Sequence, residues 1–232
     1  MRWNAALPAR RSGSGRVLPR EFFDRDTESV ARDLLGAVIE CRTAEGTAAG
    51  IIVETEAYLG EHDPACHAAA GRTRRTAPLY GVPGSAYVYF IYGMYWCVNA
   101  VTRAEGLPSA VLIRALEPVH GLELMRRRRP RARRDTDLCN GPGKLCLALG
   151  IGPEHNGLPM QKLPLRLRSG IGVNDADVAV TPRIGITRAA EWPLRWVLRG
   201  NPHASGGVGG GGGEGRRGGA GVGGGGGDEK VG

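Results

Sequence analysis

The chain has 232 residues, a length within the reach of one domain, and 41% of them are hydrophobic, enough for a sizeable core. It contains no apolar run long enough to span a membrane, and its first residues lack the apolar core of a secretory signal. The five cysteines form no CxxC pair, so we expect reduced thiols that are mostly buried. Composition therefore argues against a membrane protein and a disulfide scaffold.

The formal net charge of +8 belongs to residues 1–205, because the three basic and three acidic residues of 206–232 cancel. Two interpretations stay open: a polyanionic partner, in practice a nucleic acid, or a solvated basic face. The basic residues gather in two clusters. These comprise Arg2, Arg10, Arg11, Arg16 and Arg20, and then Arg126, Arg127, Arg128, Arg129, Arg131, Arg133 and Arg134.

Both ends of the chain are predicted to lie outside the folded domain. Residues 1–19 are expected to form a disordered basic arm, with an organellar transit peptide as the alternative. Residues 206–232 are mostly glycine, have little apolar surface to bury and are expected to be disordered. One domain is thus predicted over 20–205.

Taken in chain order, the pattern first predicts a helix over 22–35, which Gly36 ends. Strands are expected over 37–41 and 50–58, followed by a long loop over 60–84. The segment 85–102 is dense in aromatic and β-branched residues and is broken once, at Gly93, which predicts a strand–turn–strand unit.

The second half of the chain predicts a strand over 110–115, a helix over 118–129 and a short helix after the turn at 139–143. Further strands are expected within 163–170, 177–187 and 194–200. Because strands follow one another with few helices between them, we predict an α+β domain rather than alternating βαβ units.

The strand over 50–58 places two carboxylates on one face. With a period of two, Glu54 and Glu56 share a face with Ile52 and Tyr58. That face is either a solvated exterior or the wall of a polar cleft. The strand leads directly into the loop that carries His62, Asp63, Cys66 and His67, and sites are often built at such strand ends.

The strand–turn–strand unit of 85–102 carries Tyr92 and Met94 on either side of Gly93. One interpretation packs this turn against the domain. The other makes it a wedge, since an apolar or aromatic side chain inserted between base steps kinks DNA and holds open the space of an extruded base.

A metal site is a competing interpretation, because His62, Cys66 and His67 carry possible ligands, with Cys139 and Cys146 elsewhere. Their spacing matches no common zinc pattern, so we expect no metal. The chain also lacks a G-x-S-x-G, a Walker-type loop and a dinucleotide fingerprint. Lys144, at the start of the short helix, is placed to contact a phosphate.

Several strings then resemble a known family when they are taken together and in order. They are EFFDRDTESVARDLLG (21–36), IVETEAYLGEHDPACHA (52–68), YVYFIYGMYWCVNAVT (87–102), VLIRALEPVHGLELM (111–125), CNGPGKLCLALGI (139–151) and PRIGIT (182–187). Over about residues 20–205 the chain resembles the alkyladenine (3-methyladenine) DNA glycosylases. The resemblance implies a single α+β domain with a curved antiparallel sheet, surrounding helices and a protruding hairpin that inserts into DNA.

The resemblance also implies roles for individual residues. Glu56 resembles the general base that activates the attacking water, and Arg114 and the backbone carbonyl of Ile184 resemble the groups that hold this water. Tyr92 resembles the intercalating residue. The implied walls of the base pocket are Tyr58, His67, Tyr89, Asn99 and Leu112. The implied DNA contacts are Met94, Tyr95, Arg72, Thr73, Arg75, Lys144 and Gly185. The chain departs from the family pattern at Arg74, where relatives tend to carry a proline.

The implied activity is excision of alkylated or deaminated purines from double-stranded DNA: 3-methyladenine, 7-methylguanine, hypoxanthine and ethenoadenine. A cationic purine leaves easily, so one carboxylate suffices as the base. No lysine matches a Schiff-base role, which predicts hydrolysis to an abasic site without lyase activity. We expect a monomer without cofactor, metal or membrane contact, at the nucleoid of a bacterial cytoplasm, or in the nucleus of a eukaryote.

Two other function classes compete with this prediction. One is a DNA-binding module that has lost catalysis, against which the complete set of Glu56, Arg114 and Tyr92 argues. The other is a metal-dependent hydrolase built on His62, Cys66 and His67, which stoichiometric zinc would favour.

Overall fold

A computed structural model describes residues 15–205 of the chain. Most of the predicted basic arm and the whole glycine-rich tail lie outside these residues. The last part of the predicted arm is described, and it belongs to the fold. Val17 pairs with Arg168, the Leu18 amide donates to the Leu167 carbonyl, and the Leu18 side chain is buried. The described fold therefore begins at least three residues before residue 20.

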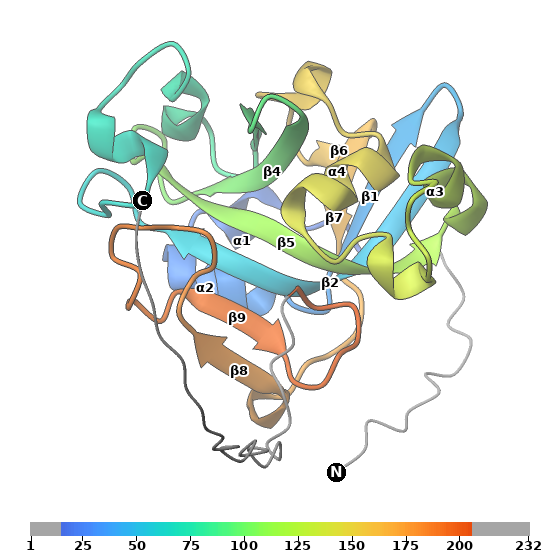
Figure 1. Cartoon of the computed structure of the whole chain (residues 1–232). Helices are drawn as coiled ribbons and strands as arrows, with labels where there is room; N and C mark the ends of the chain where they lie inside the picture. Colours follow the sequence, from blue (N-terminus) through green and yellow to red (C-terminus); the bar gives the residue numbers. More distant parts are fainter. Residues whose placement is uncertain (1–14, 206–232) are drawn as a thin grey trace, which may run out of the picture.

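The centre of the molecule is a nine-stranded sheet in which every pairing is antiparallel. The strand order is β3–β4–β5–β2–β1–β7–β6, and β9 pairs with both β2 and β8. Figure 1 shows this sheet curling around helix α4, with β2 and β5 in its middle. The strands are β1 (Val38–Thr43), β2 (Gly46–Tyr58), β3 (Ala86–Ile91), β4 (Tyr95–Thr102), β5 (Ser109–His120), β6 (Gln161–Lys162), β7 (Leu165–Arg168), β8 (Val178–Thr181) and β9 (Arg195–Leu198).

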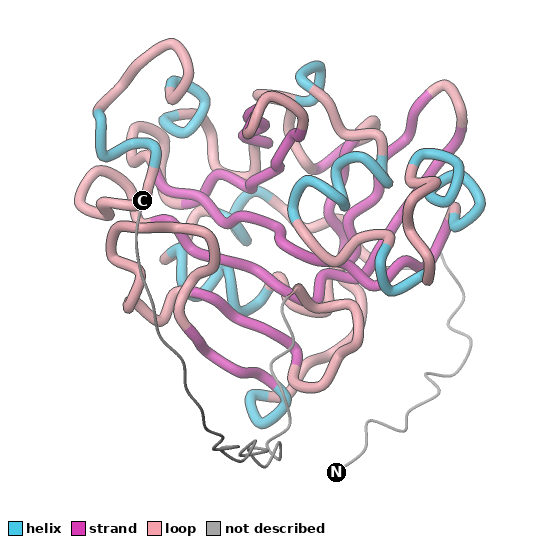
Figure 2. Tube along the Cα trace, in the orientation of Figure 1, coloured by secondary structure: helices cyan, strands magenta, loops and turns pink. Residues whose placement is uncertain are grey.

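The helices are short and lie around the sheet. They are α1 (Arg20–Phe23), α2 (Thr27–Asp33), α3 (Leu122–Arg128) and α4 (Pro142–Leu149). Five 3-10 turns, at His67–Ala70, Ala77–Tyr80, Asp135–Asp137, Pro153–His155 and Asp175–Asp177, lie in the connections. Figure 2 shows that much of the remaining chain is loop, including the connection between β2 and β3. The α+β class predicted from the strand order is confirmed.

Strand β2 organises the site because it has neighbours along its whole length. Its first half pairs with β1, its second half pairs with β9, and β5 runs along its other edge. Thr55 points toward α2, where its hydroxyl donates to the Ala31 carbonyl at 2.8 Å. Glu54 and Glu56 both contact Arg114 of β5, and both are fully buried. The interpretation of a solvated outer face is therefore wrong.

Several element boundaries differ from the prediction. The helix expected over 22–35 is two helices, because the chain turns at 24–26 and Asp26 caps α2 by accepting from the Ser29 amide. The helix expected from 118 starts at Leu122, since β5 continues to His120 and pairs with β2 there through a bulge. The strand expected over 177–187 ends at Thr181, before Pro182. All five cysteines are free and buried, as expected.

Candidate active site

A cavity of about 320 Å³ opens where the β3–β4 hairpin, β5, the β2–β3 loop and the loop 182–187 meet. The structure brings most of the predicted site residues to this cavity. Those that line it are Tyr58, His67, Tyr89, Tyr92, Asn99, Leu112, Arg114, Ile184 and Gly185, together with Ala65, Cys66, Leu79, Tyr87, Ile91, Cys97, Ala110, Pro142 and Ile186. The walls are mainly aromatic and aliphatic, which suits a flat, largely apolar ligand.

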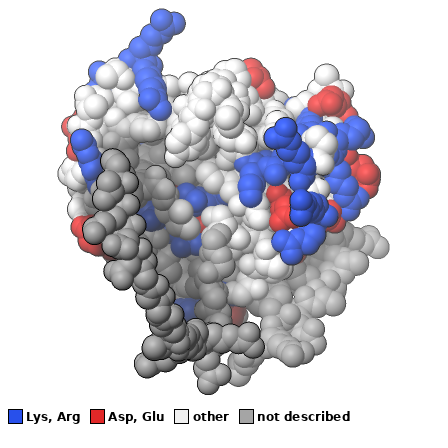
Figure 3. Space-filling view, in the orientation of Figure 1, with Lys and Arg blue, Asp and Glu red and all other residues white. Residues whose placement is uncertain are grey.

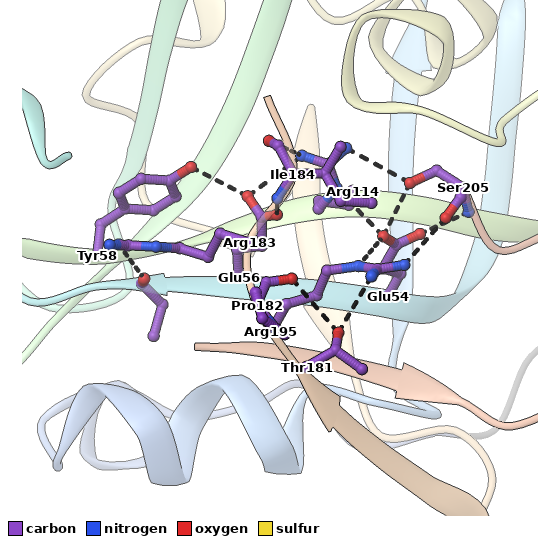
Figure 4. Close-up of polar contacts among 11 residues, drawn as sticks. Glu54, Glu56, Tyr58, Arg114, Thr181, Pro182, Arg183, Ile184, Arg195 and Ser205 are labelled. Atoms are coloured by element: carbon purple, nitrogen blue, oxygen red, sulfur yellow. Dashed lines mark hydrogen bonds and ion pairs between the residues drawn. The ribbon is translucent and has the colours of Figure 1, made fainter. Parts of the chain in front are cut away.

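Glu56 lies directly behind three of these lining residues and accepts a hydrogen bond from each. Its Oε1 accepts from the Ile184 amide at 2.7 Å, and its Oε2 accepts from the Tyr58 hydroxyl at 3.0 Å and Arg114 Nη1 at 3.2 Å. Arg114 Nη1 also approaches the Ile184 carbonyl at 3.4 Å. Figure 4 shows the four residues converging from β2, β5 and the loop 182–187. One fixed carboxylate thus stands beside one guanidinium and one backbone carbonyl.

Burial raises the pKa of Glu56 above that of an ordinary glutamate, although Arg114, the Ile184 amide and the Tyr58 hydroxyl each pull it down. A carboxylate with a raised pKa is a stronger base than an exposed one, provided that it is ionised. The guanidinium of Arg114 keeps its charge, because Glu56 and Glu54 outweigh the effect of burial on its pKa. The pair can therefore hold a proton acceptor next to a permanent positive charge.

The sequence patterns did not distinguish Glu54 from Glu56. In the structure Glu54 accepts at least as many hydrogen bonds as Glu56 does. It accepts from Arg114 Nε at 3.2 Å, Arg195 Nε at 2.7 Å, the Ser205 amide at 2.6 Å and the Ser205 hydroxyl at 2.8 Å. Its partners lie 60, 141 and 151 residues away in the chain, so local periodicity carried no signal for them. Figure 4 shows Glu54 flanked by the two arginines and Ser205.

A second buried ion pair supports the other side of the cavity. Arg183 Nη1 binds Asp63 at 2.5 Å, and both side chains are fully buried. The same nitrogen donates to the Ala57 carbonyl, and the guanidinium lies 4.7 Å from the centre of the Tyr58 ring. This pair ties the loop 182–187 to the end of β2, next to Glu56. The sequence reasoning placed Asp63 near the site but did not find its partner.

The aromatic walls of the cavity come from β2, β3 and the 3-10 turn at His67. The rings of His67 and Tyr89 lie 4.5 Å apart, and His67 Nδ1 is 2.9 Å from the Tyr87 hydroxyl. Burial, reinforced by Arg75, lowers the pKa of His67, so the imidazole is neutral at physiological pH. Burial raises the pKa of Tyr89, and it raises that of Tyr87 to about 12. All these rings are therefore uncharged.

Asn99 and Leu112 pair across β4 and β5 and are both buried at the cavity wall. The Asn99 amide nitrogen donates to the Tyr87 carbonyl at 3.1 Å, which fixes the orientation of the side chain. The wall thus carries one polar amide among apolar groups, as a site for orienting a ligand edge requires.

Tyr92 lies at the tip of the β3–β4 hairpin, where 79% of its surface is exposed. Its φ of +52° and that of Gly93, +67°, describe a tight hairpin turn in which the Met94 amide donates to the Ile91 carbonyl. A bulky residue rarely adopts a positive φ, and such strain is often kept at functional positions. The interpretation that packed this turn against the domain is wrong, because Met94 is also 64% exposed.

The remaining predicted DNA contacts surround the cavity rather than line it. Arg72, Thr73, Arg75 and Lys144 are exposed. Arg75 lies 5.9 Å from the Tyr89 ring centre, and Lys144 Nζ donates to Asn140. Gly143, beside Lys144, packs directly on Tyr95, where an added Cβ would come within 2.8 Å of the Tyr95 Cβ. Helix α4 is thereby packed against the start of β4, next to the hairpin turn.

Two of the side chains considered as metal ligands, His67 and Cys66, contact other groups. His67 faces Tyr87, and Cys66 Sγ lies 4.0 Å from the Pro108 carbonyl. Within residues 15–205, no three His, Cys, Asp or Glu side chains come together as a metal ion would require. No helix of this described part is long and apolar enough to cross a membrane.

Fold and site together describe a domain with an aromatic cavity in front of a buried carboxylate, and comparisons with known proteins identify the family of the chain. The model of the family described as methylpurine-DNA glycosylase (MPG) matches residues 21–202. A protein of Rhodopseudomonas palustris (strain HaA2), provisionally named a 3-methyladenine DNA glycosylase, is 50% identical over 195 residues, covering 82% of this chain and 91% of its own.

Two more relatives carry the same provisional name. One, from Burkholderia cenocepacia (strain HI2424), is 46% identical over 84% of this chain and 93% of its own; the other, from Methanocella arvoryzae (strain DSM 22066 / NBRC 105507 / MRE50), is 49% identical over 77% and 89%. The chain is a DNA glycosylase, an enzyme of base-excision repair that acts on DNA. It belongs to the methylpurine-DNA glycosylase family.

Proposed function

We propose that this enzyme flips alkylated or deaminated purines out of duplex DNA and hydrolyses the N-glycosidic bond with a water that Glu56 activates. The substrates would be 3-methyladenine, 7-methylguanine, hypoxanthine and ethenoadenine. The observation that carries the proposal is the position of the Glu56 carboxylate, buried behind the cavity and held by Tyr58, Arg114 and Ile184. We further propose that it acts as a monomer at the nucleoid of a bacterial cell.

In this proposal the flipped purine stacks between Tyr58, His67 and Tyr89. Uncharged aromatic rings attract electron-poor bases, and a purine alkylated at N3 or N7 carries a positive charge. The lowered pKa of His67 supports this role, because a protonated imidazole would repel a cationic base. Asn99 and Leu112 complete the wall, where an amide can reject the exocyclic amino group of guanine.

The attacking water is proposed to lie beside Glu56, Arg114 and the Ile184 carbonyl, since Arg114 is within hydrogen-bond distance of both other groups. Glu56 accepts the proton of this water as its oxygen attacks the anomeric carbon and the purine departs with the bonding electrons. The negative charge of Glu56 also stabilises the oxocarbenium-like sugar. Tyr92 is proposed to fill the gap in the stack, flanked by DNA contacts from Met94, Tyr95, Arg72, Thr73, Arg75, Lys144 and Gly185.

Base-release profiling tests this proposal. The enzyme, in buffer with EDTA, is incubated with duplexes that contain 3-methyladenine, 7-methylguanine, hypoxanthine or ethenoadenine, and the free bases are identified. We expect release of intact bases, strand breaks only after alkali and no borohydride-trapped adduct. Release that requires zinc would support the metal-dependent hydrolase, and lesion binding without release would support the binding module.

A further inference from the structure

The active-site arginine is held by a buried cluster that includes Ser205, 91 residues further along the chain. Arg114 donates through Nε to Glu54, through Nη1 to Glu56 and Ile184, and through Nη2 to the Ser205 hydroxyl. Four of the five guanidinium hydrogens thus have a protein acceptor. The planar group is consequently fixed in orientation as well as in position.

Glu54 is the centre of this cluster. It binds Arg114 and Arg195 with the same oxygen, Oε1, and its other oxygen accepts from the Ser205 amide. Arg195 Nη2 in turn donates to the Ser205 carbonyl. Glu54 and Arg195 together therefore hold the end of the segment 201–205 over β2. The two glutamates, Glu54 and Glu56, balance the two arginines, and the cluster is neutral.

We infer that Glu54 is a positioning residue for Arg114 and that Ser205 completes the active site by closing this cluster. The inference rests on the proposed function, in which Arg114 holds the attacking water. Without the Glu54 charge, Arg114 Nε would donate to a neutral oxygen and the guanidinium would be held less firmly, and the site would gain an uncompensated positive charge. Both effects oppose the reaction, because the water is misplaced and the sugar becomes cationic in the transition state.

The chain offers a matched control in Glu40 of β1. This glutamate is also buried, with 7% of its surface exposed, and it also bridges two arginines, Arg166 at 3.1 Å and Arg168 at 3.0 Å. It does not line the cavity. Glu54→Gln and Glu40→Gln should therefore lower the thermal midpoint alike but differ in catalysis.

The test measures single-turnover base release with enzyme in excess, the Kd for lesion DNA and the thermal midpoint. Glu54→Gln should slow release by about 100-fold, the cost of a misplaced group, with Kd within threefold of wild type. Glu40→Gln should leave the rate within twofold. A folded Glu54→Gln enzyme with the wild-type rate, or a rate loss shared by Glu40→Gln, would overturn the inference.

Ser205→Ala provides a second test, because it removes one hydroxyl and leaves the backbone contacts in place. It should slow release three- to tenfold without changing Kd, whereas Ser85→Ala, which removes an exposed hydroxyl, should have no effect. A wild-type rate for Ser205→Ala would remove Ser205 from the site. A wild-type enzyme that releases no base would instead contradict the proposed function, so the two failures are distinguishable.

Helix α3 and the segment that follows it carry seven arginines between residues 126 and 134. Three arginines there are bound to acidic side chains of the protein: Arg126 to Glu123 and Asp135, Arg128 to Glu45, and Arg134 to Asp137. Within the described residues, the other four form no ion pair. They are Arg127, Arg129, Arg131 and Arg133.

Basic side chains over α3 gather on the face of the molecule that Figure 3 shows. In Figure 3 the blue atoms over α3, on the right, and over the loop that carries Arg72, Arg74 and Arg75, at the upper left, stand on either side of a recess. Helix α4 links the cavity to α3. Pro142, at the start of α4, lines the cavity, and Arg128 of α3 donates to the Ala148 carbonyl near the end of α4. An eight-residue helix spans about 12 Å, well within one turn of duplex DNA.

We also propose that the four unpaired arginines form a second contact with the phosphate backbone, away from the flipped base. Two double variants distinguish a phosphate contact by these arginines from the general effect of losing positive charge. One combines Arg131→Ala with Arg133→Ala, and the other combines Arg126→Ala with Arg134→Ala. Both remove two positive charges, but only the second pair is already bound to carboxylates.

The salt dependence of binding to undamaged duplex tests this contact. Each lost phosphate contact should reduce the slope of log K against log salt by about 0.9, so the first double variant should reduce it by about two. The second should reduce it by less than half of that, and saturating single-turnover rates should stay at wild type for both. Equal slopes for wild type and the first variant, or equal losses for both variants, would overturn the proposal.

Discussion

The backbone amide of Ile184 donates a 2.7 Å hydrogen bond to Glu56 Oε1, although the two residues are 128 positions apart. The loop 182–187 is thereby fixed to β2 at the carboxylate, and Arg183 anchors it a second time through Asp63. The geometry around Glu56 thus depends on a backbone amide of this loop as well as on side chains of β2 and β5.

Removing this amide should impair catalysis specifically. Ile184→Pro deletes the donor, so we expect single-turnover release to fall by about 100-fold, because an amide bond to a charged group orients the base. Ile184→Ala keeps the amide and trims a side chain that is 37% exposed, so it should stay within a fewfold of wild type. Equal rates for the two variants would show that the amide does not matter.

The pH dependence of base release should reflect the raised pKa of Glu56. Because the general base must be ionised, the rate should fall as pH decreases through this pKa, which lies above that of an ordinary glutamate. Burial is the main cause of the shift. A pH–rate profile on 7-methylguanine DNA measures it, and an acid limb at or below the ordinary glutamate pKa would contradict the assignment.

Tyr92 should contribute to capture of the lesion and not to folding. Its side chain is exposed at a hairpin tip, so Tyr92→Ser should leave the thermal midpoint unchanged while weakening lesion binding about tenfold or more. Val180→Ser, an exposed apolar residue on β8, serves as the control. Binding of lesion DNA measured by fluorescence anisotropy distinguishes the two; similar affinities would remove Tyr92 from the DNA interface.

The Asp63–Arg183 pair should stabilise the fold at neutral pH. Asp63→Ala leaves a buried guanidinium without its partner, which typically costs about 3–5 kcal/mol of unfolding free energy. Burial alone would raise the pKa of Asp63, but hydrogen bonds from Arg183, Leu59 and Ala65 outweigh it and lower the pKa. The folded state thus binds this proton less readily than the unfolded state does.

It follows that the contribution of Asp63 is present above the ordinary aspartate pKa and is lost as pH falls through the lowered one. Urea unfolding at pH 7 and at pH 3 measures both effects. The difference between wild type and Asp63→Ala should shrink at the lower pH, and a difference independent of pH would contradict the charge-based explanation.

Local sequence patterns predicted the hairpin and the two carboxylates of β2, because aromatic density, Gly93 and a period of two are short-range signals. They left open whether Glu54 and Glu56 face solvent, since that depends on Arg114 and Arg195, which β5 and β9 bring from far along the chain. Pairing with β2 likewise extended β5 into the segment predicted as helix.

The residue roles came from the family resemblance and not from the patterns. Nothing local marks Ser205 as part of a site, because its contacts to Glu54 and Arg114 exist only once the segment 201–205 folds back over β2.

Single-turnover release of 3-methyladenine by Glu56→Gln tests the central claim most directly, with lesion binding measured in parallel. The exposed Glu61, which accepts from the Tyr80 hydroxyl outside the cluster, gives the control Glu61→Gln. We predict that Glu56→Gln binds lesion DNA within a fewfold of wild type and releases no measurable base, while Glu61→Gln matches wild type. Full turnover by a folded Glu56→Gln enzyme would contradict the account.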